Sequence, residues 1–387
     1  MLELLSNRRS FVKKTGLGAV GATALSLGIT KTARSANDEV VLGIIGTGGR
    51  GQSLLKRITN IPGIRIAAIC DLREDRRKSA ANICEQYKPT LYSDFRKLLD
   101  TEKLDGCIVA TEVGNHAKVV VPVLESGIHC FSEKPMDANV QNVDAIVRAA
   151  RKAKGIYQIG FQRRYAPTFV DGMPLVHNGD IGDLTFMQGH WHWEWSVGGW
   201  VANVAMSGGE LVEQACHHID VMSWAAGEAP IRAMGIGHIA GQGRELVNEH
   251  NSEDQSAVAF EFANGAIFSY THLFYLAHHF RSEQLVVHGT KGGIDFHAGE
   301  MYPRGEDAKP VRFGEKVTSW EYGTSLELEA FANHIRNKET PRSNVETGRL
   351  STLTALMGRM AMYKAKTKKF EGSVVTWDEL GTTTDKA

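Results

Sequence analysis

The strongest structural signal in the chain is the segment Val40-Val41-Leu42-Gly43-Ile44-Ile45-Gly46-Thr47-Gly48-Gly49-Arg50-Gly51. Its first half is a continuous apolar run, which is typical of a strand buried in a parallel sheet. Its second half has the spacing G-x-G-x-x-G, and the pattern of residues 52–60 predicts a helix. A glycine turn between a strand and a helix is typical of dinucleotide binding, because the backbone can approach a pyrophosphate at the helix N-terminus. We therefore expect cofactor contacts from Gly46, Thr47, Gly48, Gly49, Arg50 and Gly51.

A second apolar run supports this interpretation. Residues 64–70 read as a strand, and Asp71 follows directly, 20 positions after Gly51. A carboxylate there can accept hydrogen bonds from the hydroxyls of the adenosine ribose, and it would repel a 2′-phosphate. The sequence therefore favours NAD as the cofactor, while Arg73 and Arg76 leave NADP open. The alternative interpretation of Asp71 is a helix cap.

Strand and helix patterns then alternate along the chain. Strands are predicted at 106–110, 128–132 and 156–160, and helices at 73–87, 116–126 and 140–154. This alternation indicates right-handed crossovers and a parallel sheet. We expect the dinucleotide-binding domain to span residues 39–161.

Length and composition exclude several classes of protein. The chain has 387 residues, enough for two domains, and 42% of them are hydrophobic, which excludes disorder as the main state. Lys plus Arg and Asp plus Glu both number 44, so the basic excess typical of a nucleic-acid partner is missing. No apolar run reaches the roughly 20 residues of a membrane span. Five cysteines, an odd number, do not indicate a disulfide scaffold.

Residues 1–35 resemble an export signal. Arg8 and Arg9 stand before Ser-Phe-Val-Lys, as in twin-arginine signals, and a weakly apolar stretch follows at 15–30. Ala33-x-Ser35 fits the small-x-small cleavage rule. We expect a twin-arginine signal peptide, recognition by the twin-arginine export machinery, and a periplasmic or otherwise exported protein. The alternative is an ordinary basic amphipathic N-terminus.

Three further motifs carry a resemblance to a known family. They are Glu133-Lys134-Pro135, Gly160-Phe161-Gln162-Arg163-Arg164-Tyr165, and the segment 208–220, which reads GGELVEQACHHID. Together with the glycine turn they resemble the Gfo/Idh/MocA family, which includes glucose–fructose oxidoreductase and inositol dehydrogenase. The resemblance covers nearly all of the chain after residue 35. It implies an α/β fold, with an N-terminal Rossmann parallel sheet followed by a substrate-binding and oligomerisation domain over 162–387. That second domain would carry a large, mostly antiparallel open sheet, whose face in the family often forms the interface of a homo-oligomer.

The residues after position 230 agree independently with such a sheet. Runs of β-type residues occur at 256–262, 266–274 and 284–288, and Asn264-Gly265 is a hairpin-turn signal. Helices are predicted at 325–336 and 347–364.

The resemblance also implies the catalytic residues. His217 matches the catalytic histidine of the family, Glu213 matches the acidic residue one turn earlier, and Lys134 matches a lysine that contacts substrate and nicotinamide ribose. The adjacent Glu133 is expected, like Lys134, to contact the cofactor. The implied chemistry is hydride transfer from a ring carbinol carbon to the nicotinamide, with His217 taking the hydroxyl proton. The alternatives are an ordinary helix pair for Glu213 and His217, and a surface lysine for Lys134.

The helical pattern over 209–226 agrees with this assignment. Glu213, His217 and Asp220 fall at i, i+4 and i+7, so they would share one face of a single helix. The sequence departs from the family pattern where Glu213 replaces the commoner Asp and Ala215 replaces the usual Gly. Residues 112–116 also lack a proline often found there. These departures put the detailed substrate geometry in doubt but leave the cofactor site intact.

Candidate substrate contacts are Arg163, Tyr165, Trp193 and Asp220. Trp191, Trp193 and Trp195 alternate along a strand pattern, and aromatic faces can stack on sugar rings. The alternatives are salt bridges between domains for the arginines, an aromatic core for the tryptophans and a structural role for Asp220. His190 and His192 have no convincing ligand set around them in the sequence, so we predict no metal site.

Three functions are compatible with an exported nicotinamide protein. The first is oxidation of a sugar or polyol on tightly bound NAD. The second is redox-neutral cleavage of a glycoside, by oxidation at C3, elimination, hydration and re-reduction, as in some exported relatives that resemble the NAD-dependent α-N-acetylgalactosaminidases. The third is a sugar-binding protein that has lost its chemistry.

Overall fold

The computed structural model describes residues 39–194, 198–239, 251–315, 320–367 and 374–384. The predicted export signal and Trp195 lie outside these residues. Among the helices within them, none is both long and apolar enough to cross a membrane.

A six-stranded parallel sheet forms the first domain, with strand order β3-β2-β1-β4-β5-β6. Its strands are β1 (Val40–Ile45), β2 (Ile64–Cys70), β3 (Thr90–Tyr92), β4 (Gly106–Val109), β5 (His129–Ser132) and β6 (Tyr157–Ile159). Its helices are α1 (Gly49–Ile58), α2 (Glu74–Ile83), α3 (Phe95–Thr101), α4 (His116–Glu125) and α5 (Val140–Lys152). The strand order reverses between β1 and β4, and ligands of such sheets bind at the carboxyl ends of the strands next to this reversal.

Apolar packing explains why these segments fold together. The side chains of Leu42 and Ile44 in β1 are buried against Leu54 and Ile58 of α1. Each such side chain contributes about 1.5–3 kcal/mol on burial. The helix α10 (Trp320–Asn337) also packs in this core although it comes late in the chain, and the rings of Phe131 and Phe331 lie 5.8 Å apart.

A second sheet of nine strands follows, in the order β14-β13-β12-β11-β7-β10-β9-β8-β15. The strands β7 and β10 run parallel and the other neighbours run antiparallel. The strands are β7 (Leu184–His192), β8 (Arg232–His238), β9 (Gln255–Glu261), β10 (Ile267–Leu273), β11 (Ser282–Gly289), β12 (Gly292–Asp295), β13 (Glu300–Pro303), β14 (Val311–Arg312) and β15 (Val375–Thr376). The predicted fold class is therefore confirmed, including the β9–β10 hairpin, in which Gly265 has φ +84°.

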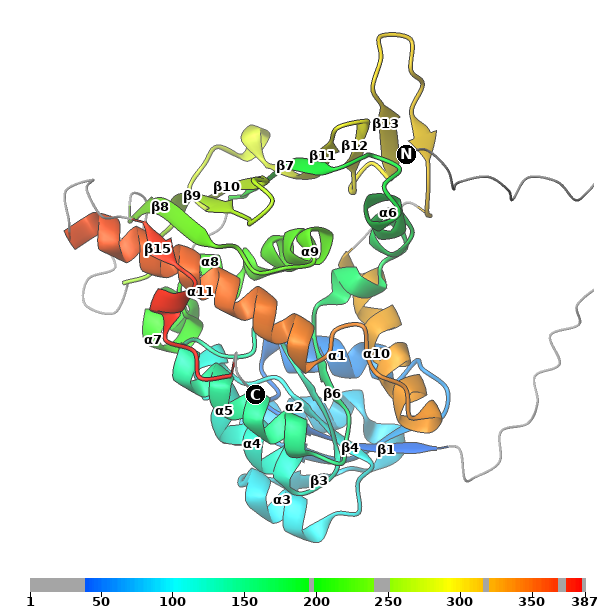
Figure 1. Ribbon diagram of the computed structural model, residues 1–387. Coiled ribbons are helices and arrows are strands. Elements are labelled where there is room, and N and C mark those ends of the chain that lie inside the picture. The colour runs from blue at the N-terminus through cyan, green and yellow to red at the C-terminus, as the bar shows by residue number, and fades with distance from the viewer. Residues whose placement is uncertain (1–38, 195–197, 240–250, 316–319, 368–373, 385–387) are drawn as a thin grey trace, which may run out of the picture. The chain divides into compact units, whose positions relative to one another are not determined.

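One face of this sheet, the inner face, packs against helices. The helices α9 (Cys216–Ala226) and α11 (Val345–Thr367) lie between the second sheet and the first domain, and α6 (Pro167–His177) lies beside α9 (Figure 1). The side chains of β7 alternate accordingly: Met187 and Trp191 are buried on the inner face, whereas Gln188 points to the opposite, outer face. The remaining short helices are α7 (Val204–Ser207) and α8 (Glu210–Glu213).

Candidate active site

The glycine turn joins β1 to α1, as predicted, and two of its glycines are required by the backbone. Gly46 has φ +90°, and a Cβ there would lie 2.6 Å from the carbonyl oxygen of Ala110. A Cβ on Gly51 would lie 2.1 Å from the carbonyl oxygen of Gly46. The first turn of α1 carries no acidic residue, so its N–H groups can receive the phosphates of a dinucleotide.

Asp71 lies at the carboxyl end of β2 and holds the glycine turn in place. One carboxylate oxygen accepts hydrogen bonds from the backbone N–H of Thr47 at 2.7 Å and from its hydroxyl at 3.2 Å. The other accepts the backbone N–H of Arg73 at 2.9 Å, immediately before α2. The guanidinium of Arg76 lies beside the turn, 3.5 Å from the position of a Cβ on Gly48. Asp71 thus stabilises both the glycine turn and the start of α2, while its contact with the ribose stays a prediction.

Arg50 points from α1 toward the carboxyl end of β5. Its Nε donates to Glu133 at 2.6 Å, and its Nη2 lies 3.4 Å from the hydroxyl of Thr324 and 3.5 Å from the carboxylate of Glu327. Burial raises the pKa of Glu327 well above its usual range, and the charge of Glu133 acts in the same direction. Arg50 therefore connects the glycine turn to α10. Sequence reasoning missed Thr324 and Glu327, because isolated polar residues in a helical pattern resemble a solvated face.

Lys134 and Glu213 meet although they lie far apart in the sequence. The Nζ of Lys134 donates to the backbone carbonyl of Glu213 at 2.5 Å and to its carboxylate at 3.0 Å. Both side chains are largely buried. Burial lowers the pKa of Lys134, but the charges of Glu213 and other neighbours and the hydrogen bond to Glu213 together outweigh burial, so the pKa lies above its usual value. Lys134 thus stays a cation.

His217 completes the group from the first turn of α9. Burial, together with the positive charges of Lys134 and Arg163, lowers its pKa well below the usual range, so the ring is neutral. A cavity of about 340 Å³ brings these residues together, and its lining is Arg50, Ser53, Arg57, Lys134, Gln162, Trp191, Glu213, Gln214, His217 and Thr324. We call this cavity the catalytic pocket.

The segment predicted as one helix over 209–226 is two helices, α8 and α9. The backbone N–H of Ala215 bonds to the carbonyl of Glu210 at 3.1 Å, which makes a turn one residue wider than an α-helical turn. Gly208 and Gly209 precede this turn with φ of +83° and +88°. The prediction of a single polar face was therefore wrong in detail. The break still leaves Glu213 and His217 at the same pocket.

Two predicted substrate contacts have partners elsewhere. Asp220 is fully buried and accepts three hydrogen bonds from Arg164 at 2.9–3.0 Å and one from Ser351 at 2.6 Å. The hydroxyl of Tyr165 lies 3.1 Å from that of Ser343. Neither residue is among those that line the catalytic pocket. The geometry favours the structural interpretation of Asp220, and contact with substrate stays a prediction for both.

The other two predicted contacts, Arg163 and Trp193, are also not among the residues that line the catalytic pocket. Arg163 bonds to Glu283 of β11, and its guanidinium lies 5.3 Å from the ring of Trp191. Trp193, just beyond β7, is 39% exposed, and the guanidinium of Arg281 lies 5.0 Å from the centroid of its ring. Trp191, which was one of several candidates in the sequence, is the tryptophan that lines the catalytic pocket.

Comparison with known proteins identifies related families and folds. A family model described as "Oxidoreductase family, NAD-binding Rossmann fold" matches residues 40–161, and one described as "GFO/IDH/MocA C-terminal domain" matches residues 174–295. The prediction of an NAD-binding domain is thus confirmed. An uncharacterised oxidoreductase of Bacillus subtilis is 28% identical over 59% of this chain and 65% of its own length. The inositol 2-dehydrogenase of Salmonella typhimurium is 28% identical over 48% of this chain, which spans 54% of that relative.

Longer matches have lower identity. The myo-inositol 2-dehydrogenase of Thermotoga maritima is 23% identical over 85% of this chain and 98% of its own. Among solved structures, the myo-inositol 2-dehydrogenase of Lactobacillus plantarum has a TM-score of 0.71 at 22% identity, covering 87% of this chain and 99% of that one. Levoglucosan dehydrogenase, solved with NADH and levoglucosan, has a TM-score of 0.75 at 17% identity, covering 87% and 99%. At these identities the structures establish a shared fold.

Proposed function

Since the chain belongs to the Gfo/Idh/MocA family of oxidoreductases, we propose that it is an NAD-dependent dehydrogenase of a sugar or polyol. The observation that carries this proposal is the convergence of Lys134, Glu213 and His217 on one pocket. These residues come from both halves of the chain, and the pocket also includes Arg50 of the glycine fingerprint. A neutral imidazole can act as a general base in alcohol oxidation, and a charged lysine can stabilise the negative charge that develops on the oxygen.

The residues present fit a nicotinamide dinucleotide. A Cβ on Gly49 would meet nothing within 4 Å and one on Gly48 would meet only the guanidinium of Arg76, so a pyrophosphate could approach the backbone there. Asp71 is the proposed acceptor for the ribose hydroxyls. When bound, NAD supplies the acceptor of the hydride. His217 would take the proton of the substrate hydroxyl, and Lys134 would stabilise the negative charge that develops on that oxygen. Glu213 would hold the ammonium group of Lys134 toward the pocket through its two contacts.

The first experiment identifies the cofactor. The protein is purified without added nucleotide and denatured, and the released nucleotides are identified by mass spectrometry. Near-stoichiometric NAD(H) supports a permanently bound cofactor, and sugars, polyols and glycosides are then screened for reduction of that NAD. Binding of a sugar with neither reduction of NAD nor any product would support a sugar-binding protein without chemistry.

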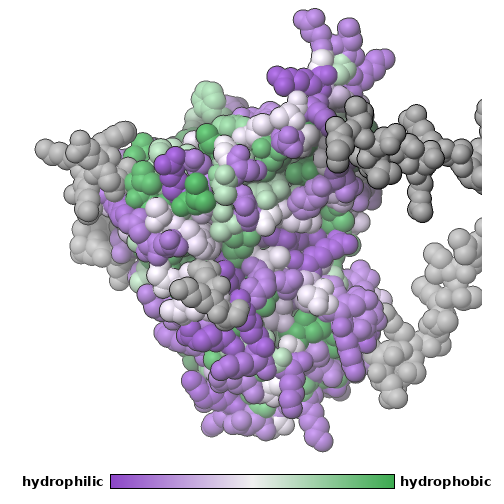
Figure 2. All heavy atoms as spheres, in the orientation of Figure 1, coloured by the Kyte–Doolittle hydropathy of each residue, from purple (hydrophilic) through white to green (hydrophobic). Residues whose placement is uncertain are grey.

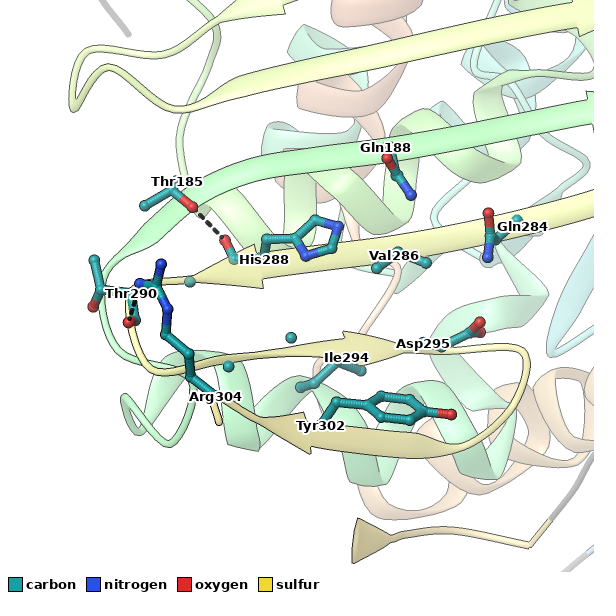
Figure 3. Close-up of a pocket in the computed structure, with 13 residues that line it drawn as sticks. Thr185, Gln188, Gln284, Val286, His288, Thr290, Ile294, Asp295, Tyr302 and Arg304 are labelled. Carbon is teal, nitrogen blue, oxygen red and sulfur yellow. Dashed lines mark hydrogen bonds between the residues drawn. The ribbon is translucent and has the colours of Figure 1, made fainter. Parts of the chain in front are cut away.

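His217→Ala then tests the site on the sugar that the screen identifies. Loss of a general base lowers turnover by roughly 10²–10⁴-fold. The matched control is His288→Ala on the outer face, which should leave turnover unchanged (Figure 3). Full turnover by the His217 variant with NAD still bound would disprove the assignment.

Redox-neutral cleavage of a glycoside is the second candidate function. The observation that favours it is the exposure of Trp193 and Trp200, which are 39% and 38% exposed and offer aromatic faces to a larger glycoside. This route exchanges the hydrogen at C2 of the sugar with solvent. Cleavage in deuterated water that leaves this hydrogen in place would exclude it.

We also propose that a second copy of the chain covers the outer face of the second sheet. Met234, Ile236 and Ile267 are 50%, 53% and 41% exposed there, and Figure 2 shows hydrophobic surface over β8. A hollow of about 810 Å³ extends over β7, β11, β12 and β13 (Figure 3). Ile236→Lys should lower the mass measured by light scattering, whereas Leu91→Lys, on an edge strand of the other sheet, should not. An unchanged mass for the Ile236 variant would contradict the proposal.

Export is proposed from the sequence of residues 1–35. Replacing Arg8 and Arg9 by lysine should retain the protein in the cytoplasm of its cell. The measurement is the distribution of the protein between cytoplasmic and exported fractions. Unchanged export of the double-lysine protein would argue against the twin-arginine route.

A further inference from the structure

A cluster of ligand-type side chains lies on the inner face of the second sheet, outside the residues that line the catalytic pocket. His218 comes from α9, Glu283 from β11, and His297 from the turn between β12 and β13. One nitrogen or oxygen atom from each lies within 4.8 Å of the other two. Glu283 is paired in register with Trp191, whose ring stacks on His218 at 5.2 Å. The cluster is therefore a direct neighbour of the pocket.

Three nitrogen atoms converge on one carboxylate oxygen in this cluster. The Nε2 atoms of His218 and His297 lie 2.8 and 3.1 Å from Oε1 of Glu283, and Arg163 bonds to the same oxygen. A carboxylate oxygen offers about two acceptor positions, so three donors exceed what it can accommodate. The Nδ1 atoms of both imidazoles are buried, and no residue within the described ranges gives them a hydrogen bond. Hydrogen bonding between the side chains thus leaves this cluster poorly satisfied.

A bound cation resolves this crowding. Imidazole nitrogen and carboxylate oxygen bind zinc at about 2.0–2.2 Å, so neighbouring ligand atoms around such an ion are roughly 3.0–3.4 Å apart. The two separations from Oε1 lie within a few tenths of an ångström of that range. With an ion in place the two rings would face the metal instead of competing for one oxygen. Arg163 would then be left as the donor to the carboxylate.

The surroundings hold the ligands in place and leave a route for an ion. The rings of His218 and Tyr270 form a T-shaped pair with centroids 5.5 Å apart, and those of His297 and Phe169 form another with centroids 5.8 Å apart. These aromatic contacts fix the ring planes. The side chain of His297 is 30% exposed and that of Glu283 is 16% exposed, so the cluster opens to solvent on one side.

We propose that His218, Glu283 and His297 bind one divalent transition-metal ion. Two imidazoles and one carboxylate suit zinc, cobalt, iron or manganese better than calcium or magnesium, which prefer oxygen ligands. Arg163 is a positioning residue that orients the carboxylate, and its positive charge limits the affinity for the cation. The ion would link α9 to β11 through His218, which directly follows His217. It takes no part in hydride transfer. This proposal replaces the expectation from the sequence that the chain holds no metal. The sequence carries no signal for the site because two of the three ligands lie on segments without any sequence motif.

Cobalt binding tests the proposal on the tag-free full chain. Residual metal is removed with a chelator, Co²⁺ is added, and visible absorption and calorimetry report the coordination and the stoichiometry. We expect one equivalent with a visible d–d band, which zinc should displace. His297→Ala and Glu283→Gln should each weaken binding by at least tenfold, since even outer partners of a ligand change affinity by about 10–100-fold. Arg163→Met should tighten it.

The matched control is His192→Ala. His190 and His192 form a second imidazole pair on the outer face, with ring centroids 4.7 Å apart. The control variant should bind cobalt as the parent does. Binding that is lost in His192→Ala but retained in His297→Ala would overturn the proposal, as would the absence of a stoichiometric site in the parent chain. Because His297 lies in a partly exposed turn, its variant carries the test even if the Glu283 variant fails to fold, and circular dichroism checks the fold of each.

Discussion

Replacing Arg164 by methionine should destabilise the protein strongly. The Arg164 side chain is 4% exposed and that of Asp220 is fully buried, and three hydrogen bonds join them. The variant keeps the hydrogen bond from Ser351 to Asp220 but leaves a buried carboxylate without its counter-charge. Removing one partner of a buried pair costs about 3–5 kcal/mol. Asp220 lies one turn after His217 on α9, so the loss should also disturb the catalytic pocket.

The sign of the pH dependence follows from Asp220. Burial raises the pKa of Asp220 even beside Arg164, and without the guanidinium the pKa must rise further. A carboxyl group whose pKa is raised in the folded state destabilises the fold increasingly as pH rises from the unfolded value through the folded one. The Arg164→Met variant should therefore be less destabilised at pH 5 than at pH 8.

Urea unfolding at both pH values measures these effects. The control is Arg73→Ala, which breaks the exposed pair with Asp75 and should cost at most about 1 kcal/mol. The double variant Arg164→Met with Asp220→Leu removes the uncompensated charge and should be more stable than Arg164→Met alone. A loss for Arg164→Met within 1 kcal/mol of the control, or a double variant less stable than the single one, would refute the reasoning.

Three further predictions concern the cofactor turn and the C-terminal segment. Gly51→Ala places a Cβ 2.1 Å from the carbonyl oxygen of Gly46, and this overlap must distort the turn. The free energy of NAD binding, measured by calorimetry, should therefore weaken by about 1–3 kcal/mol. Asp71→Ser removes a charged acceptor worth about 1.5–3 kcal/mol, so NAD should bind roughly 10–100-fold more weakly and NADP should lose less, as competition binding would report. Burial raises the pKa of Asp144, but hydrogen bonds from Thr383 and its neighbours outweigh burial and keep it below its usual value. Asp144→Asn should therefore destabilise the chain at pH 7, and its deficit in urea unfolding should shrink as pH falls through that lowered pKa. A deficit that grows toward acid pH would contradict the assignment.

The parallel sheet was predictable because its signals are local. The strand at 40–45 is a continuous apolar run and the strand at 64–70 is apolar apart from Arg65, and the structure has both with the predicted bounds. The strand Thr90–Tyr92 and the helix Phe95–Thr101 were missed, because each is too short to establish a period. The single helix predicted over 209–226 failed because its apolar period continues across the wide turn at Ala215.

The catalytic pocket was partly predictable for a different reason. Lys134, Glu213 and His217 lie in motifs that could be read, and the structure brings them to one cavity. Thr324 and Glu327, which contribute to the surroundings of Arg50, lie in a helical segment that the sequence leaves as ordinary polar positions. Their importance depends on the packing of α10 against the first domain, a long-range contact that no local pattern encodes.

The same limit explains why the cluster of His218, Glu283 and His297 has no sequence signal. Metal sites that can be read from a sequence have ligands at short, regular spacings, as in a helix with two histidines one turn apart. Here β11 lies beside β7 only because the second sheet is assembled in that order, and the turn after β12 brings His297 back over the inner face. The alternation of the strands then decides which residues meet: Glu283 faces the helices, and its neighbour Gln284 faces the hollow of the outer face. A shift of one residue in the β7–β11 register would turn Glu283 away from Arg163 and from both histidines. The register of this strand pair therefore determines whether the cluster exists at all.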